Sequence, residues 1–261
     1  MALNIDKNAS VHPDAQIGDN VTIGPFTVIE KDVIVGEGTQ IGSHALLANG
    51  TRVGKECKIH HGAVLGTLPQ DLKFGGEATT LEVGGNTTIR EYATLNRGTK
   101  AHMRTVVGSN CFLMAYVHVA HDCVLGNNVI LANSVNMAGH VEIEDYAIIG
   151  GMTPIHQFVR IGKHAMVGGG LRVSKDIPPY ILAANEPMSF EGTNIIGLRR
   201  RNFSAECIAN IKKTYRLLYE SGYNVTQAVE KIKAELPNTV EVSSILEFIA
   251  KSKRGIIGRK R

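Results

Sequence analysis

His121 and its neighbours form the part of the sequence best suited to acid–base chemistry. Asp122 adjoins His121, and Gly139 follows 18 residues later. An imidazole is the side chain best placed to exchange a proton near neutral pH. A glycine can present its backbone N–H to a developing oxyanion without obstruction by a side chain. Three more histidines lie in the same stretch: His118, His140 and His156. This combination favours a catalytic role for His121, beside the simpler interpretation of a solvated corner residue.

A zinc site is a competing interpretation, because three histidines from neighbouring subunits of a repeat protein can hold Zn²⁺. The spacing of His118 and His121 suits such a site poorly, since the repeat places one on a face and the other at a corner. We therefore predict no metal. The histidines His44, His60 and His61 lie far along the chain and are interpreted as surface residues.

A six-residue repeat must position these side chains. Aliphatic residues recur at every sixth position from Val11 to Leu65 and again from Val107 to Val173. The residue four places after each is small or β-branched, so positions one and five face inward across an outward position six, as in a short β-strand. Positions two to four are rich in Gly, Asn and Asp, which favour turns. The repeat predicts a solenoid with three strands in each 18-residue coil.

Stacking of the coils at roughly 4.8 Å would align residues that are 18 apart. One predicted column contains His121, Gly139 and Gln157 at an outward corner. A second column, at a different corner, holds small side chains and could form a groove. Its members are Ala115, Asn133, Gly151 and Gly169.

The interruptions of the repeat predict the domain organisation. The solenoid is expected over residues 1–180, with loop excursions near 70–82 and 97–106, where ligand contacts would concentrate. Pro178 and Pro179 are expected to end it, because proline cannot donate to a strand ladder. A connector over 181–203 and a helical domain over 204–261 follow, with a helix that begins at Ser204.

Composition excludes several functional classes. The 261 residues carry a net charge of +4, too little to indicate nucleic-acid binding. The four cysteines lack a CxxC motif. Three of them, Cys57, Cys111 and Cys123, fall on position five of the repeat and are expected to be small buried core residues in a reducing cytosol. The sequence has neither a signal peptide nor a long apolar run, so we predict a cytoplasmic protein without a membrane span. The cluster Arg199–Arg201 is either a solvated face or an anion site, and Lys212, Lys213 and Arg216 could meet an acidic protein partner.

Seven motifs, taken together, closely resemble the acyl-[acyl-carrier-protein]:UDP-N-acetylglucosamine O-acyltransferases. The resemblance covers essentially the whole chain and implies a mainly β fold, a left-handed parallel β-helix with a C-terminal α-helical domain. It also implies a homotrimer with active sites between subunits. The motifs are Pro69–Lys73, His118–Cys123, Ala138–His140, Ile149–Met152, His156–Phe158, Asp176–Tyr180 and Asn194–Arg201.

The resemblance implies transfer of a (3R)-3-hydroxyacyl group from acyl carrier protein to the 3-hydroxyl of UDP-N-acetylglucosamine, which opens lipid A biosynthesis. Phosphopantetheine arrives on the carrier protein, so the chain would need no cofactor of its own. His121 would be the general base, Asp122 would orient it, and the Gly139 N–H would stabilise the oxyanion. Gly169 corresponds to the position that limits acyl length.

The resemblance also implies a set of residues that hold the substrates, namely Asp71, Lys73, His118, His140, His156, Gln157, Asn194, Arg200 and Arg201. Two positions depart from the family pattern: Ile196 replaces an expected Glu, and the segment Ala184–Met188 lacks a histidine that some members carry. Two other enzyme classes built on such a solenoid are alternative functions for this chain. One is an N-acyltransferase, which normally has an additional N-terminal domain, and the other is a zinc-dependent carbonic anhydrase. A scaffold role is the third alternative.

Overall fold

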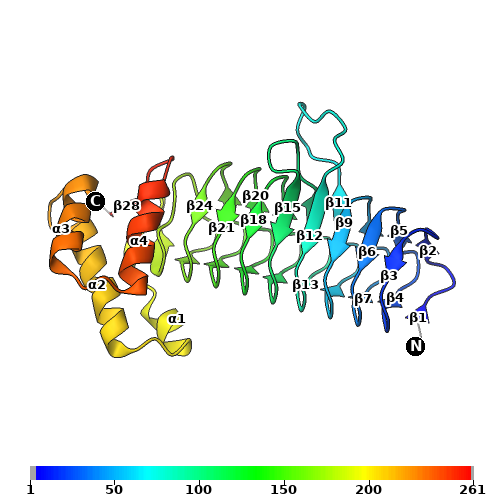
Figure 1. Ribbon diagram of the computed structural model, residues 1–261, viewed down its shortest axis with the longest axis horizontal. Helices are drawn as coiled ribbons and strands as arrows, with labels where there is room; N and C mark the ends of the chain where they lie inside the picture. Colours follow the sequence, from blue (N-terminus) through cyan, green and yellow to red (C-terminus); the bar gives the residue numbers. More distant parts are fainter. Residues whose placement is uncertain (1–3, 260–261) are drawn as a thin grey trace.

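The computed structural model describes residues 4–259. These residues form a long prism of stacked coils, and three helices are packed together at its C-terminal end (Figure 1). The three faces of the prism are parallel sheets, which we call sheets A, B and C. The chain visits them in the order A, B, C in each coil, so sequential strands belong to different sheets. The fold is a left-handed parallel β-helix, as predicted.

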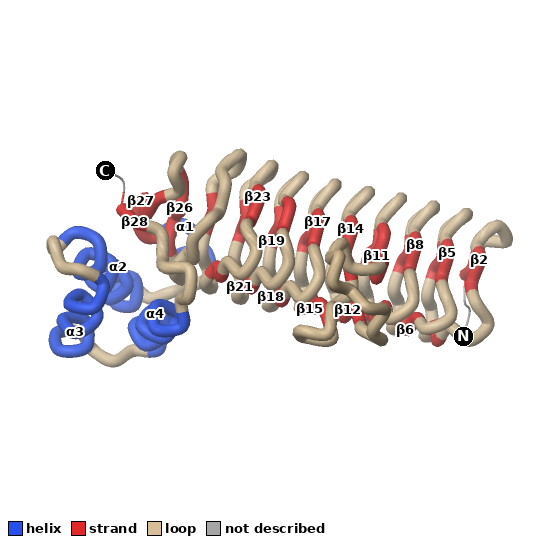
Figure 2. Tube along the Cα trace, turned by 90° about the horizontal axis from the view of Figure 1, so that it is seen from above, coloured by secondary structure: helices blue, strands red, loops and turns tan. Residues whose placement is uncertain are grey.

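The strands of each sheet stack in regular rows (Figure 2). Sheet A contains β1 Asn4–Ile5, β4 Thr22–Ile23, β7 Gln40–Ile41, β10 Lys58–Ile59, β13 Thr88–Ile89, β16 Phe112–Leu113, β19 Ile130–Leu131, β22 Ile148–Ile149, β25 Met166–Val167, β26 Ile181–Ala184, β27 Ser189–Thr193 and β28 Gly258–Arg259. Sheet B contains β2 Ser10–Val11, β5 Val28–Ile29, β8 Leu46–Leu47, β11 Val64–Thr67, β14 Thr94–Asn96, β17 His118–Val119, β20 Asn136–Met137 and β23 Pro154–Ile155. Sheet C contains β3 Gln16–Ile17, β6 Val33–Val35, β9 Thr51–Val53, β12 Thr80–Val83, β15 Arg104–Val107, β18 Val124–Leu125, β21 Glu142–Ile143 and β24 Arg160–Ile161.

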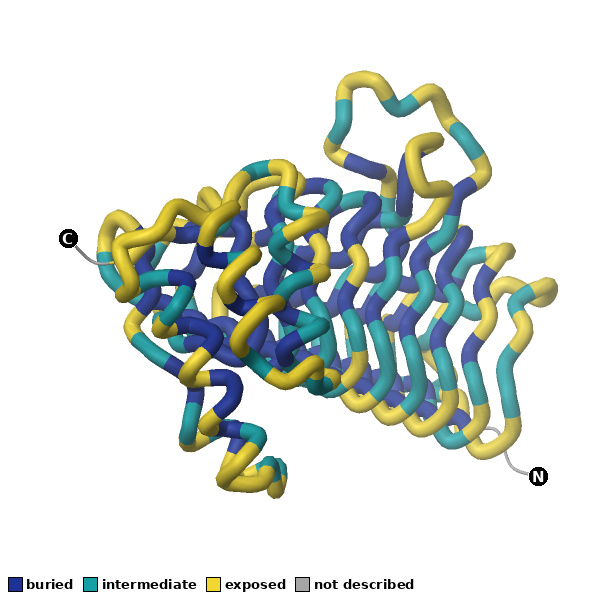
Figure 3. Tube along the Cα trace, turned by 60° about the vertical axis from the view of Figure 1, so that its left-hand side comes forward, coloured by how far each residue is buried: buried dark blue, intermediate teal, exposed yellow. Residues whose placement is uncertain are grey.

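The six-residue repeat produces the core as the sequence predicted. Val119, Cys123 and Leu125, at positions one, five and one of successive repeats, have exposed fractions of 1% or less. Burial of each such aliphatic side chain contributes roughly 1.5–3 kcal/mol. Figure 3 shows the buried residues along the inside of the prism and exposed residues at many of its turns. The core is therefore a thin continuous column, and each coil depends on its neighbours for burial.

Position four of the repeat adopts a left-handed backbone conformation at most turns, even without glycine. Asp122, His140 and Phe158 have φ values of 59°, 61° and 63°. The backbone N–H at this position donates to a carbonyl one coil below, as from His140 to His121 at 3.1 Å and from Phe158 to Gly139 at 3.2 Å. Turns therefore stack in columns, which places His121, Gly139 and Gln157 in one file as predicted.

The turn columns form the three edges of the prism. The BC edge, between sheets B and C, carries turns 120–122, 138–140 and 156–158. The CA edge carries 126–128, 144–146 and 162–164, and the AB edge carries 132–134, 150–152 and 168–170. Every turn residue can thus be assigned to one edge from its place in the repeat.

Both loop excursions leave the BC edge, after β11 and after β14 (Figure 1). They span residues 68–79 and 97–103, so they end earlier than the predicted 70–82 and 97–106. The reason is that the ladder re-forms at once: Leu81 pairs with Thr51, and Thr80 pairs with Arg104. The original phase is kept, because Val83 pairs with Val53 below and with Val107 above.

The tandem prolines do not end the solenoid, contrary to prediction. Beyond them β26 pairs in parallel with β25, with Leu182 opposite Met166. Pro178 and Pro179 lie in the turn that precedes this strand, where no ladder donor is required of them. The predicted connector 181–203 is itself ordered, since it contains β26, the antiparallel β27 and the short helix α1 Ile195–Arg200.

The three remaining helices follow their sequence signals. They are α2 Ala205–Glu220, α3 Val225–Glu235 and α4 Val240–Lys251. Ser204, Asn224 and Thr239 cap their N-termini through side-chain oxygens. The rings of Tyr219 and Phe190 stack at 4.5 Å and join α2 to β27. Among residues 4–259, no helix is long and apolar enough to cross a membrane.

His164 is buried, although it occupies turn position four of the repeat, at an edge of the prism. Its ring stacks between Tyr146 at 4.8 Å and Tyr180 at 5.6 Å, and only 8% of it is exposed. It belongs to a second apolar layer outside the prism, formed where the segment around α1 covers the CA edge. Burial, followed by the charges of Arg201 and Lys163 and opposed by that of Asp145, lowers the pKa of His164 to about 4.

This depressed pKa makes stability depend on pH. Below the ordinary histidine pKa of about 6.5, His164 binds a proton in the unfolded chain but not in the folded chain. The free energy of unfolding therefore falls as pH decreases towards 4. Between pH 7.5 and pH 4.5 the free energy of unfolding should fall by roughly 2–3 kcal/mol less in His164→Phe than in the wild type, because each pKa unit corresponds to about 1.4 kcal/mol. Thermal melts of wild type and variant between pH 7.5 and pH 4.5 would measure it. Phenylalanine already occupies the equivalent left-handed turn position at Phe158. An equal fall in melting temperature for both proteins over this pH range would contradict the assignment.

Candidate active site

His121 and Asp122 lie at the turn that joins β17 to β18 on the BC edge. His121 Nδ1 is 2.8 Å from Asp122 Oδ2. The Asp122 side chain is fully buried, whereas 13% of the His121 side chain is exposed. A buried carboxylate therefore holds an imidazole whose other nitrogen, Nε2, remains available.

Three donors from the 97–103 loop complete the surroundings of Asp122. The Thr99 N–H and the His102 N–H donate to Oδ1 at 2.9 and 3.2 Å. The Thr99 hydroxyl donates to Oδ2 at 2.6 Å. Burial, the largest influence, would raise the pKa of Asp122, but hydrogen bonds from Thr99 and His121 outweigh it and lower the pKa. Asp122 is therefore a carboxylate at neutral pH.

Gly139 lies directly against the His121 ring, one coil further along. A Cβ at Gly139 would be 2.5 Å from His121 Cε1 and 2.7 Å from Nε2. Contacts that short are not tolerated, so only glycine lets the ring take this position. Within residues 4–259 the Gly139 N–H donates no hydrogen bond. It is thus a free donor beside the predicted base.

His140 closes one side of this cluster. Its ring meets the His121 ring edge-on at 5.1 Å and stacks on Phe158 at 4.6 Å. Its Nε2 atom is 3.8 Å from Asp122 Oδ2. Burial lowers the pKa of His140, while the Asp122 charge opposes the shift. His140 is thus neutral at physiological pH and can donate or accept a hydrogen bond.

Three further predicted residues surround the same corner. His118 lies on sheet B, its Nδ1 is 2.7 Å from the Thr94 hydroxyl, and burial lowers the pKa of its ring. His156 and Gln157 are exposed at the next turn of the BC edge, where His156 Nδ1 is 3.2 Å from the Gln157 carbonyl oxygen. The structure therefore brings His118, His156 and Gln157 to the edge that carries His121.

The 68–79 loop brings Asp71 and Lys73 to this edge as well. Asp71 Oδ1 accepts the Lys73 N–H at 2.9 Å, and the Lys73 side chain is exposed. The Asp71 charge is among the influences that raise the pKa of His140, which places the loop near the cluster. Arg97, the first residue of the other excursion, holds this loop against the prism. Its guanidinium lies 5.7 Å from the centre of the Phe74 ring and donates to the Asn49 carbonyl at 2.9 Å.

Asn194, Arg200 and Arg201 belong to a different edge. The Arg201 guanidinium lies over the Tyr146 ring of the CA edge at 5.1 Å. The Asn194 amide caps α1 by accepting the Gly197 N–H at 3.1 Å. It also donates to the His164 carbonyl at 3.0 Å and is 7% exposed, so the Asn194 side chain stabilises the packing of α1 on the CA edge. One chain does not bring these residues to His121.

Gly169 lies on the third edge. A Cβ built there would meet the Gly151 carbonyl at 2.9 Å, and one built on Gly151 would meet the Asn133 carbonyl at 3.0 Å. These contacts establish the predicted column of small residues on the AB edge. The predicted site residues are therefore distributed over all three edges of the prism.

One group of potential metal ligands includes the predicted base. Ligand atoms of His121, Asp122 and His140 lie within 4.8 Å of one another. Both carboxylate oxygens of Asp122 already accept two hydrogen bonds each, and His121 Nδ1 is engaged with one of them. A metal ion would have to displace these donors, so the residues fit a hydrogen-bonded carboxylate–imidazole pair better than a metal centre.

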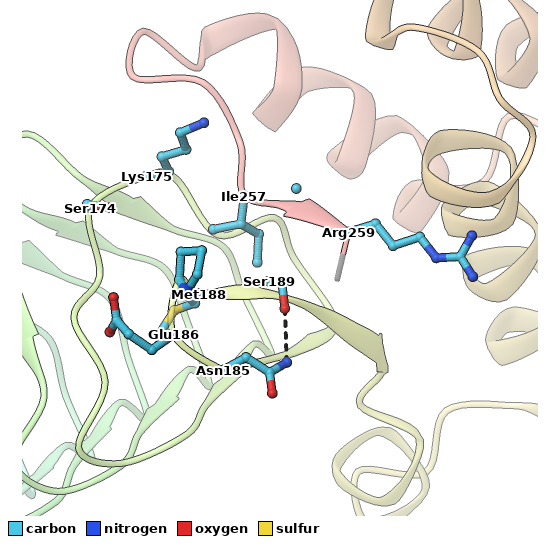
Figure 4. Close-up of a pocket in the computed structure, with 10 residues that line it drawn as sticks. Ser174, Lys175, Asn185, Glu186, Met188, Ser189, Ile257 and Arg259 are labelled. Carbon is cyan, nitrogen blue, oxygen red and sulfur yellow. Dashed lines mark hydrogen bonds between the residues drawn. The ribbon is translucent and has the colours of Figure 1, made fainter. Parts of the chain in front are cut away.

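Several cavities flank the C-terminal half of the solenoid, and two of them border predicted residues or segments. One of about 730 Å³ is bordered by His102, His140, Phe158 and Lys251 and extends from the His121 cluster to α4. Another of about 780 Å³ lies beyond the last coil (Figure 4). It is lined by Lys175, by the segment from Asn185 to Ser189 that lacks the expected histidine, and by Arg259.

Comparisons with known proteins identify the family of this chain. The family described as Udp N-acetylglucosamine O-acyltransferase; Domain 2 matches residues 176–257, and bacterial transferase hexapeptide repeats match 4–31, 32–67 and 104–139. The acyl-[acyl-carrier-protein]–UDP-N-acetylglucosamine O-acyltransferase of Thiobacillus denitrificans is 44% identical over 77% of this chain and 78% of its own length. The chain belongs to this O-acyltransferase family.

Further relatives agree with this membership. The enzyme of the same name from Nautilia profundicola is 47% identical over 76% of each chain. The solved UDP-N-acetylglucosamine acyltransferase from Bacteroides fragilis superposes with a TM-score of 0.95 and 50% identity, covering 97% of this chain and 99% of that one. The O-acyltransferase fold is thus shared along essentially the whole chain.

Sequence reasoning missed Thr99 and His102 of this O-acyltransferase. The break in the repeat marked their loop as an excursion, but nothing in its residue types indicated that it folds back onto Asp122. The hydrogen bonds that reveal their roles join residues 20–23 apart, a separation that the 18-residue period does not predict.

We expect Gly139→Ala to lower acyl transfer about a hundredfold while leaving the solenoid folded, because a misplacement of about 1 Å can cost that much. The added methyl group would push the His121 ring aside. Gly85→Ala is the matched control: it holds the same repeat position on the CA edge, and its Cβ would meet only the Lys55 carbonyl, at 3.1 Å. Steady-state rates and melting temperatures of both variants would be compared. Equal activities would remove Gly139 from the site.

Proposed function

We propose that this chain transfers a (3R)-3-hydroxyacyl group from acyl carrier protein to the 3-hydroxyl of UDP-N-acetylglucosamine, the opening step of lipid A biosynthesis. Family membership supports the reaction class. The observation that carries the mechanism is the buried Asp122 carboxylate bonded to His121 Nδ1 at 2.8 Å, with the free Gly139 N–H beside the same ring.

His121 is the general base in this proposal. Its bond to Asp122 favours the tautomer with the proton on Nδ1, which leaves the Nε2 lone pair for the sugar 3-hydroxyl. As Nε2 takes the hydroxyl proton, the oxygen attacks the thioester carbonyl and a carbon–oxygen bond forms. The positive charge that develops on the imidazole is stabilised by the Asp122 carboxylate.

Gly139 acts on the tetrahedral intermediate. Its backbone N–H stabilises the oxyanion that replaces the carbonyl oxygen. Collapse of the intermediate breaks the carbon–sulfur bond, and the leaving pantetheine thiolate recovers the proton from His121 Nε2. The base is thereby returned to its neutral form, and no other proton acceptor is required.

The remaining residues would hold the substrates. His118, His140, His156 and Gln157 border the BC edge and would contact the sugar, the diphosphate or the pantetheine arm. Asp71 and Lys73 approach from the loop above. Asn194, Arg200 and Arg201 would bind the nucleotide, with Arg200 exposed and Arg201 half-buried.

A homotrimer would assemble these parts. Since His121, Arg201 and Gly169 lie on three different edges, a complete site needs edges from more than one chain. The AB edge exposes an apolar file that another subunit could cover: Phe26 is 57% exposed, Tyr92 46%, Tyr116 61% and Met152 73%. The active sites would accordingly lie between subunits, with acyl carrier protein drawn to the exposed Lys212, Lys213 and Arg216 of α2.

The chain would work in the cytoplasm with no metal and no cofactor of its own, because the base and the oxyanion donor are both protein groups and phosphopantetheine comes with the donor. A nucleic-acid partner is not proposed, since the net charge is only +4.

We expect His121→Ala to abolish transfer, by a factor of about 10² or more, with the solenoid still folded, because the reaction loses its base while Asp122 keeps its three donors from the 97–103 loop. The assay pairs UDP-N-acetylglucosamine with a 3-hydroxyacyl carrier protein, and His12→Ala at the exposed N-terminal end of the same edge is the control. Retained transfer would refute the proposed base.

The same variant tests the shared site. Co-assembly of His121→Ala chains with Arg201→Ala chains should restore activity at roughly a quarter of the sites, those that combine an intact histidine from one chain with an intact arginine from its neighbour. Failure to recover activity in co-assembled oligomers would place both residues within one chain's site.

We expect Gly169→Met to shift preference towards shorter acyl donors, because its side chain would fill the groove of small residues on the AB edge. Carrier proteins loaded with 3-hydroxyacyl chains of graded length would give the profile for both enzymes. The glycine itself is compatible with a long donor. An unchanged length profile would show that the acyl chain does not pass this edge.

A further inference from the structure

The 97–103 loop closes over Asp122 by means of tight backbone constraints. Gly98 admits the return of the chain, because a Cβ there would lie 2.3 Å from the Arg104 nitrogen. The Met103 N–H donates to the Thr99 carbonyl at 2.7 Å and completes the turn. Thr99 is 6% exposed and lies where the loop touches Asp122. The loop is thus a folded clasp and not an open insertion.

The clasp supplies most of what holds the carboxylate. Four donors meet its two oxygens, and three of them belong to the clasp: the Thr99 N–H, the Thr99 hydroxyl and the His102 N–H. Only the fourth is His121. Burial of a carboxylate without such donors is strongly unfavourable, so the carboxylate takes the direction in which the clasp donors reach its oxygens.

The Thr99 hydroxyl has a fixed orientation. Its oxygen accepts the Ala101 N–H at 3.2 Å, which directs its own proton towards Asp122 Oδ2 at 2.6 Å. The same oxygen Oδ2 bonds His121 Nδ1 at 2.8 Å. The hydroxyl and the imidazole therefore share one carboxylate oxygen, and the position of the first determines that of the second.

We propose that Thr99 is a positioning residue for acyl transfer, which aims the Asp122 carboxylate at His121. The inference rests on the proposed roles of His121 and Asp122. Thr99 need not touch substrate, since it acts only through Asp122.

The test compares Thr99→Val, which keeps the shape but removes the hydroxyl, with Thr99→Ser, which keeps the hydroxyl. We expect Thr99→Val to lower kcat roughly tenfold to a hundredfold with KM for UDP-N-acetylglucosamine little changed, because one hydrogen bond to a charged group is lost. Thr99→Ser should retain activity within about threefold of wild type. The acidic limb of the kcat/KM–pH profile should move to higher pH in the valine variant, because that limb reports protonation of the base, and a carboxylate that has lost one donor attracts the protonated base more strongly.

Thr87→Val is the matched control. Thr87 is fully buried, and its hydroxyl donates to the Gly108 carbonyl at 2.9 Å on another edge, so the same chemical change occurs without contact with Asp122. It should keep the wild-type kcat and pH profile. A similar loss of activity in Thr87→Val and Thr99→Val would indicate a general effect on the fold and would overturn the proposal.

Failure of this inference can be told from failure of the proposed function. If His121→Ala is inactive while Thr99→Val keeps the wild-type kcat and pH profile, Thr99 has no positioning role but the base stands. If His121→Ala is active, the base assignment fails and the positioning role fails with it. Equal loss in the valine and serine variants would also overturn the inference, since the hydroxyl would not be what matters.

Discussion

The whole structure depends on parallel stacking of coils at a fixed register. Each coil pairs with the coil below through ladder bonds such as His118 with Asn136 and Val119 with Met137. A shift of one residue would move every aliphatic side chain from the core to the surface. Loops can therefore leave the prism only if they return in phase, as both excursions do. The same register stacks turn upon turn, and it makes a site out of residues that are far apart in sequence.

The proposed active site is built around a costly element, a carboxylate without solvent exposure. Asp122 is tolerated at the corner because four donors satisfy its oxygens and because the turn supplies the left-handed backbone that directs it. Three of these donors come from a loop that contributes little to the core. The loop therefore interrupts the regular solenoid and, in the same place, preorganises the carboxylate that holds the proposed base.

The division of the functional residues among three edges has a geometric reason. Turns that differ by one repeat point in different directions, so a single prism cannot converge its edges on one substrate. His121 lies on the BC edge, Arg201 leans on Tyr146 at the CA edge and Gly169 lies on the AB edge. The exposed apolar file of the AB edge fits the proposal that neighbouring chains complete each site.

The sequence by itself determined the solenoid and the columns, because a strict period of six assigns each residue to one face or one edge of the prism. It also determined the helices, because their N-cap residues and apolar spacing are local signals. The same period places His121 beneath Gly139. Only the tertiary structure decided that Thr99 and His102 clasp Asp122, that β26 continues sheet A beyond Pro179, and that His164 is buried under the segment around α1. These features arise where the repeat is broken, and there the contacts depend on how a loop or a terminal segment folds back, which no periodicity encodes.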